Sequence, residues 1–165
     1  SVFARHVEEE DELTASYRIQ VDSVVAAEAN RRIEKEHDKL ELARLRELSL
    51  LKLVRSQSDD LVPALMSRLG PVRAALDGHG GSLVVADVEE TNRASGESAL
   101  TFVIDLDGAC VSCGAAPGTL KGIQDDLLHD DEIISVKFSS AMLDWFDDLQ
   151  KEFILKYGEV TFVKV

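Results

Sequence analysis

Residues 23–57 contain neither glycine nor proline, and this constrains the fold of the chain more than any other feature. Ala, Glu, Leu, Arg and Lys dominate the segment, and all five residue types are good helix formers. A helix of this length far exceeds the average of about 11–12 residues and would span about 50 Å. We therefore favour an oligomerisation or partner helix over the alternative, a surface helix packed on its own domain.

Apolar residues in this helical segment lie near one broad stripe, as a surface for another chain requires. Strict heptads fail, because Arg44 and Glu47 occupy positions where a coiled coil needs apolar side chains. We expect coiled-coil-like packing without a regular heptad. The residues predicted to face a partner are Leu40, Leu48, Leu51 and Val54.

The segment before this helix is strongly polar. Glu8 to Glu12 are consecutive acids, which predicts that residues 1–12 form a solvated acidic tail. Apolar and polar residues alternate over residues 17–21, a pattern that also suits a short strand. We favour a helix there, because the apolar positions continue into the helical segment that follows.

The charge of the chain limits the partners that it can bind. It has 31 acidic side chains against 18 Lys plus Arg, a net charge of -13. Residues 59–138 hold 14 of these acids and 5 basic side chains, so they form the acidic body of the chain. Nucleic-acid phosphates and anionic lipid both need a basic face, so we expect neither as a partner.

The cysteine count and the hydropathy indicate the cellular compartment. Two cysteines are too few for a disulfide framework. No apolar run reaches the roughly 20 residues that span a bilayer, and no secretory signal pattern opens the sequence. We expect a cytoplasmic protein with no membrane span. Its apolar fraction of 45% is enough for the core of one ordinary domain.

The body of the chain changes from helical to strand periodicity. Asp59 or Asp60 can cap a helix, which Gly70-Pro71 interrupts, and a second helix follows to the glycines at 78–81. Strands are then predicted over residues 83–88 and 100–106, with a polar loop from Glu89 to Ser98. Pro117 opens another helix, whose buried face is expected to carry Leu120, Ile123, Leu127 and Leu128.

The end of the chain continues this α+β pattern. A third strand is predicted over residues 133–138, then one helix, and a final short strand within Glu159 to Val165. Apolar residues recur three and four positions apart in this last helix, as on a core or partner face. They are Met142, Trp145 or Phe146, Leu149 and Phe153.

The chemical candidate is the run Cys110-Val111-Ser112-Cys113. Two thiols three positions apart can bind one metal centre or each other. Alternatives are a thioredoxin-type redox pair, a zinc site and a pair of packed thiols. No His/Asp arrangement supports Ser112 as a nucleophile, so we do not expect an enzyme.

Four runs around this motif together resemble one known family. They are Val72 to Leu83 with His79-Gly80-Gly81, Leu106-Asp107-Gly108-Ala109-Cys110-Val111-Ser112-Cys113, Thr119-Leu120-Lys121-Gly122-Ile123 and Ile133-Ile134-Ser135-Val136. In order and spacing, residues 60–138 resemble the NifU C-terminal, or Nfu, domain. This resemblance implies a small three-stranded mixed sheet packed by helices, and it implies that His79 is not a ligand.

The resemblance also implies an iron–sulfur cluster scaffold or carrier. Cys110 and Cys113 would bind a [4Fe–4S] cluster together with two cysteines of a second protomer, in at least a dimer. The loop that supports the cluster would comprise Gly108, Ala109, Val111, Ser112 and Gly114. Apo iron–sulfur target proteins would receive the cluster, and zinc is the substitute metal.

The segments outside this domain suggest another function. Residues 1–58 would be the acidic tail and partner helix, residues 59–138 the Nfu-like domain, and residues 139–165 the C-terminal helix and strand. The long helices could dock the chain permanently on a larger redox enzyme such as a hydrogenase. It would then be a scaffold or electron-transfer subunit. A third interpretation is an Nfu-like fold used only for interaction.

Overall fold

The computed structural model describes residues 2–78, 83–107 and 117–165, which belong to two compact units. The first unit comprises Ser1–Leu42 and the second Ala43–Val165. The sequence placed the boundary at residue 58 instead. The boundary lies earlier because buried leucines between residues 45 and 53 belong to the second unit.

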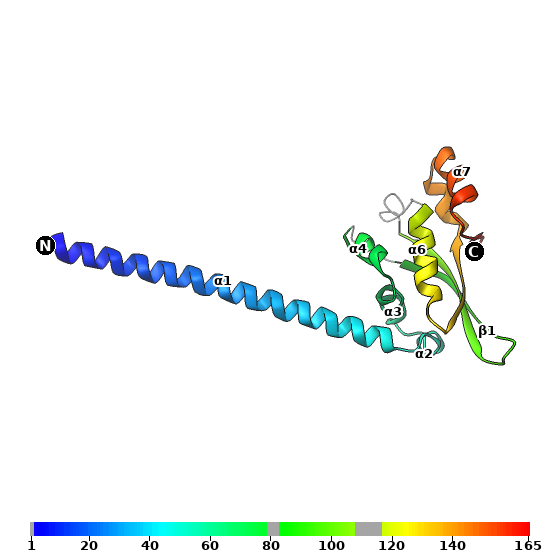
Figure 1. The fold of residues 1–165 in the computed structure, drawn as a ribbon, viewed down its shortest axis with the longest axis horizontal. Coiled ribbons are helices and arrows are strands. Elements are labelled where there is room, and N and C mark those ends of the chain that lie inside the picture. Colours follow the sequence, from blue (N-terminus) through cyan, green and yellow to red (C-terminus); the bar gives the residue numbers. More distant parts are fainter. Residues whose placement is uncertain (1, 79–82, 108–116) are drawn as a thin grey trace. The chain divides into compact units, whose positions relative to one another are not determined.

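Helix α1 (Val2–Glu47) makes up the first unit and continues into the second (Figure 1). The segment predicted as a solvated acidic tail over residues 1–12 is helical from Val2 onward, because α1 includes the acidic run. Acids in a helix stay solvated when the side chains face water, as those of Asp11 and Glu12 do. The preference for helix over strand at residues 17–21 is confirmed. Among the described helices, none combines the length and the apolar character needed to span a membrane.

The predicted uninterrupted helix over residues 23–57 is wrong, because α1 ends at Glu47 and α2 (Leu50–Arg55) begins anew. Ser49 has an extended backbone between them. The carboxylate of Glu132 accepts hydrogen bonds from Ser49 Oγ at 2.8 Å and from the backbone N–H of Leu50 at 3.0 Å. It also accepts one from the N–H of Leu51 at 3.1 Å. A carboxylate at this position satisfies the free N–H groups of the first helical turn.

The leucines around this break belong to the core of the second unit. Leu45, Leu50 and Leu53 are buried. Three residues that were expected to face a partner, Leu48, Leu51 and Val54, are half-buried and pack against the same core. Only Leu40 of the predicted set is exposed, at 70%. The turn at Ser49 directs the other three inward.

A surface ion pair joins α2 to the first strand of the sheet. Arg55 Nε donates to Glu90 Oε1 at 3.1 Å, and Arg55 Nη2 donates to the same oxygen. This hydrogen bonding lowers the pKa of Glu90 and raises the pKa of Arg55.

Two short helices follow α2, as predicted. They are α3 (Leu61–Ser67) and α4 (Pro71–Gly78), and the break at Gly70-Pro71 is confirmed. Asp60 occupies the N-cap position of α3 but makes no capping hydrogen bond with its side chain. Its carboxylate instead lies 3.6 Å from Nη1 of Arg44, which ties α3 to the end of α1.

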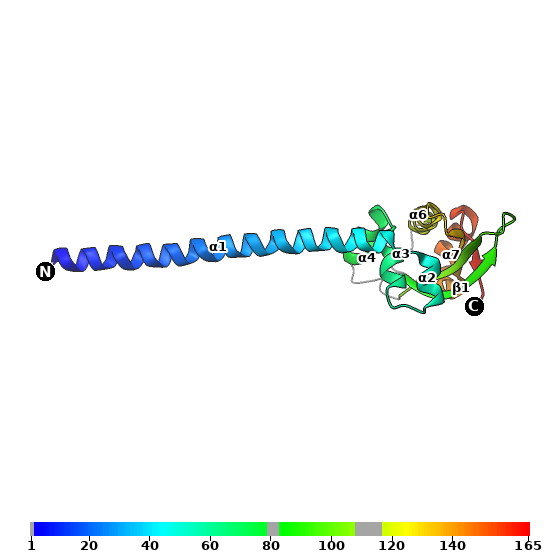
Figure 2. The same cartoon turned by 90° about the horizontal axis from the view of Figure 1, so that it is seen from below.

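The sheet has the order β1-β2-β3-β4, and helix α6 (Pro117–Leu128) connects β2 to β3 (Figures 1 and 2). Strands β1 and β2 are antiparallel, whereas β2 and β3, and β3 and β4, are parallel. The α+β class and the mixed sheet are confirmed. The short strand expected near the C-terminus pairs as a fourth strand. The strands are β1 (Leu83–Asn92), β2 (Ser98–Leu106), β3 (Ile133–Ser139) and β4 (Phe162–Val163).

The hairpin between β1 and β2 is tighter than the loop predicted over residues 89–98. Glu89 pairs with Thr101 and Asn92 pairs with Ser98, so polar residues extend both strands. Backbone pairing needs no apolar side chain, which is why hydropathy missed it. Gly96 supplies the positive φ of 88° that the turn requires.

The core lies between β2 and the helices. The alternating residues of β2 from Leu100 to Leu106 are buried, and β2 is flanked by β1 and β3. Leu120, Ile123 and Leu127 of α6 are also buried, whereas Leu128, expected on the same face, is exposed. The three buried positions follow helical spacing, and Leu128 lies one residue around the helix from them.

The single helix predicted after β3 is in fact two elements. A 3₁₀ helix, η1 (Ser140–Trp145), precedes α7 (Asp148–Tyr157). The side chain of Asp147 accepts a hydrogen bond from the N–H of Gln150 at 2.7 Å, and Gln150 bonds back to the N–H of Asp147 at 3.2 Å. This capping box starts a new helix. Met142 and Phe146 are buried as expected, whereas Trp145, Leu149 and Phe153 are exposed.

Arg68 fastens the N-terminal helices to the rest of the unit. Its guanidinium donates to the carbonyl oxygens of Leu45 at 3.1 Å, Ala64 at 2.7 Å and Leu48 at 2.7 Å. Its Nε lies 2.6 Å from Oδ2 of Asp130, in the turn between α6 and β3. The side chain of Arg68 is only 9% exposed, so its charge depends on these partners.

We expect Arg68→Ala to lower the free energy of unfolding by about 3–5 kcal/mol, because it leaves Asp130 and several carbonyl groups without their donor. Arg68→Lys should recover little, since an ammonium cannot reproduce the planar fork. Urea unfolding measures both effects. Arg32→Ala removes only an exposed ion pair with Glu28 and should change stability by less than about 0.5 kcal/mol. Equal effects of Arg68→Ala and Arg32→Ala would contradict this role.

Candidate functional site

The candidate site lies at the connection from β2 to α6. The predicted ligands Cys110 and Cys113 lie outside the described residues, as does His79. So do all the residues predicted to support a cluster, namely Gly108, Ala109, Val111, Ser112 and Gly114. The structure does describe the strand and the helix that this connection joins.

The strand side of the connection is buried and paired. Leu106 ends β2 and pairs with Leu83, the first residue of β1, and both side chains are buried. Because these strands are antiparallel, residues 79–82 join β1 at the same end of the sheet where residues 108–116 leave β2. Both glycine-containing segments of the family resemblance therefore attach to the fold at one pair of residues.

The helix side of the connection is the amino end of α6. Pro117 occupies the first helical position, where its missing N–H costs nothing. The amino end of a helix carries partial positive charge and favours a thiolate over a thiol. Lys121 adds a cation within this helix, but its Nζ lies 3.1 Å from Oδ1 of Asp125. Its charge is thus directed along α6 in this structure.

Two carboxylates stand at the end of β2. Asp105 and Asp107 are both half-buried. Oδ1 of Asp105 accepts a hydrogen bond from the backbone N–H of Leu106 at 2.8 Å. Negative charge at this position opposes a thiolate or an anionic cluster, whereas the amino end of α6 favours both. The site therefore combines opposing electrostatic contributions.

Helix α4 packs against α6. A Cβ atom at Gly122 would lie 3.1 Å from Cγ2 of Val72, which leaves little room for a side chain. The N–H of Gly70, just before α4, donates to Oδ2 of Asp126 at 2.8 Å. Sequence reasoning missed these roles of Gly122 and Asp126. The signal was a glycine within a helix, which often marks close packing.

The runs that carry the family resemblance occupy distinct elements. The run from Val72 ends with α4 and resumes at the start of β1, and Leu106 closes β2. Residues 119–123 lie in α6 and residues 133–136 in β3. Within the described ranges, no three His, Cys, Asp or Glu side chains gather closely enough to hold a metal ion.

No protein-family model, no curated protein and no solved structure matches the chain.

We expect Gly122→Leu to lower the free energy of unfolding by about 1–3 kcal/mol, because the larger side chain must displace α4 at Val72. Gly118→Leu, in the same helix, is the matched control, since a Cβ there meets no atom within 4 Å. Thermal and urea unfolding of both variants measure the difference. If the two substitutions had the same effect, the close packing of α4 on α6 would not hold.

Proposed function

We propose that this protein is an iron–sulfur cluster scaffold or carrier. In this proposal Cys110 and Cys113 bind a [4Fe–4S] cluster shared with a second protomer, and the cluster is delivered to apo target proteins. The protein is not an enzyme in this proposal. The observation that carries it is the position of the CxxC motif between buried strand β2 and helix α6, within the element order of an Nfu-like domain.

The number of cysteines explains why the site must be shared. A [4Fe–4S] cluster has four irons, and each takes one thiolate. The sequence contains two cysteines, so two protomers together provide the four ligands. Four thiolates would also bind zinc, which makes zinc the substitute metal. In either case, the amino end of α6 would stabilise the negative charge of the thiolates.

We expect anaerobic reconstitution with iron and sulfide to give a brown protein with acid-labile sulfide and about four irons per dimer. Cys110→Ser and Cys113→Ser should each abolish the colour, because a ligand is lost from both halves of the site. Absorbance, iron analysis and sulfide analysis measure these results. A colourless wild-type protein that binds zinc would support the substitute metal. A colourless protein that binds neither metal would contradict the proposal.

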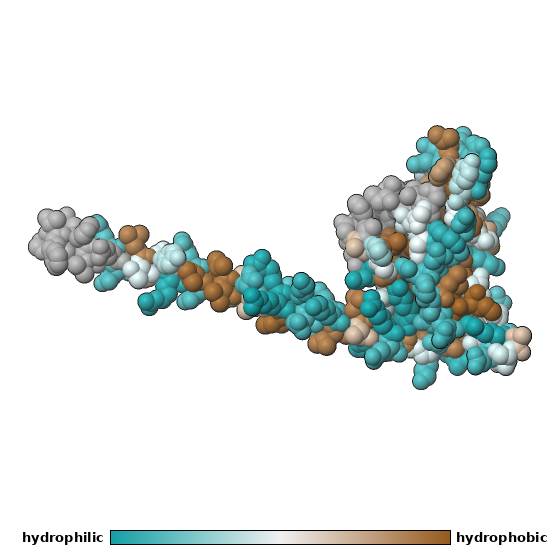
Figure 3. All heavy atoms as spheres, in the orientation of Figure 1, coloured by the Kyte–Doolittle hydropathy of each residue, from teal (hydrophilic) through white to brown (hydrophobic). Residues whose placement is uncertain are grey.

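A second candidate function is that of a subunit docked on a larger redox enzyme, as a scaffold or for electron transfer. The observation that favours it is the exposed apolar surface of α1, visible as separate brown areas along the helix in Figure 3. Val24, Val25, Ile33 and Leu40 are all exposed there. Ile33 and Leu40 line a shallow hollow with His37. Exposed apolar area of this kind marks an interaction surface.

If α1 docks on such an enzyme, Ile33→Glu with Leu40→Glu should release the protein from the complex purified from its native source. Stability should not change, because both side chains are already exposed. Asn30→Glu, a polar and exposed position of the same helix, is the control and should remain bound. Size-exclusion chromatography of the complex measures release. Retention of the double variant would contradict docking through this surface. If the docked protein also passes its cluster to an acceptor, the result favours the carrier over the permanent subunit.

A further inference from the structure

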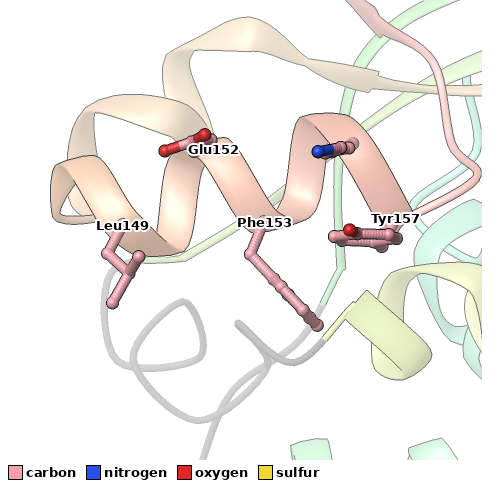
Figure 4. A pocket seen from close by; sticks show the side chains of 5 residues that line it. Leu149, Glu152, Phe153 and Tyr157 are labelled. Atoms are coloured by element: carbon pink, nitrogen blue, oxygen red, sulfur yellow. The ribbon is translucent and has the colours of Figure 1, made fainter.

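Helix α7 carries an exposed apolar stripe. Leu149, Phe153 and Tyr157 lie four residues apart along one side of the helix and are 77%, 51% and 58% exposed (Figure 4). The Phe153 and Tyr157 rings are in contact, with centroids 5.1 Å apart. Ile154, on another side of the helix, is buried and fixes its orientation on the domain. The stripe is therefore a defined surface.

We propose that this stripe is where two copies of the chain meet, with α7 packed antiparallel against α7 of the second copy about a two-fold axis near Phe153. This contact rests in part on the proposed function and deepens it, because it names the surface that brings the second pair of cysteines. The first argument for a second copy as the occupant is the charge pattern beside the stripe.

Glu152 and Lys156 flank the stripe on one side of α7, one helical turn apart, and both line the hollow formed by the stripe. In an antiparallel pair of α7 helices related by a two-fold axis, the sides that carry Glu152 and Lys156 lie on the same face of the pair. The two helices run in opposite directions along that face. Glu152 of each copy then meets Lys156 of the other. The surface is thus complementary to itself in charge as well as in apolar character.

The second argument is the position of α7 in the fold. Strands β2 and β3 are parallel, so the cysteine connection and η1 leave the sheet at the same end. Helix α7 packs against α6, and β4 returns to pair with the last residues of β3. A dimer paired through α7 would therefore bring the two copies together near the end of the sheet from which the connection to Cys110 and Cys113 starts.

The size of the stripe sets the strength of the contact. A ten-residue helix is about 15 Å long, so the buried area falls below the roughly 1,200 Å² of a standard stable interface. The cluster-free protein should therefore dimerise weakly and reversibly. A shared cluster would then strengthen the dimer, since its ligands come from both copies.

The test is sedimentation velocity on the full chain carrying Cys110→Ser and Cys113→Ser, so that no cluster contributes. We expect a concentration-dependent monomer–dimer equilibrium. Glu152→Lys or Lys156→Glu alone should weaken it about tenfold, because both cross-copy ion pairs become repulsive. The double exchange should restore the dimer, and an equimolar mixture of the two single variants should form a heterodimer.

Phe153→Asp should abolish the dimer. Leu155→Asp is its matched control, because Leu155 is also exposed but lies about 200° around the helix from Phe153. Circular dichroism verifies that both variants are folded. Sedimentation as a monomer at every concentration, or a dimer unaffected by Phe153→Asp, would overturn the proposal.

The same variants in the wild-type cysteine background separate this proposal from the proposed function. If reconstitution fails while the charge exchange still controls dimerisation, the contact holds and the cluster proposal is wrong. If a shared cluster forms equally well in Phe153→Asp, the cluster proposal holds and the contact is wrong.

Discussion

The buried charge of Arg68 is the constraint on which the rest of the second unit depends. A guanidinium that is almost removed from water must have its donors satisfied. Those of Arg68 are taken by backbone carbonyls at the end of α1 and within α3, and by Asp130 in the turn before β3. Two residues further along, Glu132 caps the start of α2. One turn thus holds three helical segments.

This arrangement places the attachment of the N-terminal helices and the candidate cysteine site at opposite ends of β2. The turn lies where β3 begins, and the N–H of Leu100, near the start of β2, donates to the carbonyl of Glu132 at 2.8 Å. The cysteine connection leaves β2 after Leu106, at the other end of the same strand. A largely buried strand lies between the two ends. A ligand exchanged at the cysteine end would therefore not have to disturb the anchoring at Arg68.

Local patterns in the sequence predicted the strands, the break at Gly70-Pro71 and the buried face of α6, because each depends on neighbouring residues. They did not predict the end of α1, because the break at Ser49 depends on a hydrogen bond to Glu132, which lies 83 residues away in the sequence. They also could not separate core from surface in α7. Leu149 and Phe153 have the spacing of a core face, but the capping box at Asp147 restarts the helix and buries Ile154 instead. The cysteine site remains a prediction from motif and order.

The two exposed apolar surfaces would suit the two proposed functions differently. A carrier has to release its cluster, so the protein contact that assembles the site should be weak and the cluster should supply much of the dimer's stability. The short stripe of α7 meets this requirement, and it lies at the cysteine end of the sheet. A permanent subunit needs a larger contact, which the exposed apolar residues of α1 could provide. The two contacts would be made by separate helices, so the proposal for α7 does not depend on the one for α1.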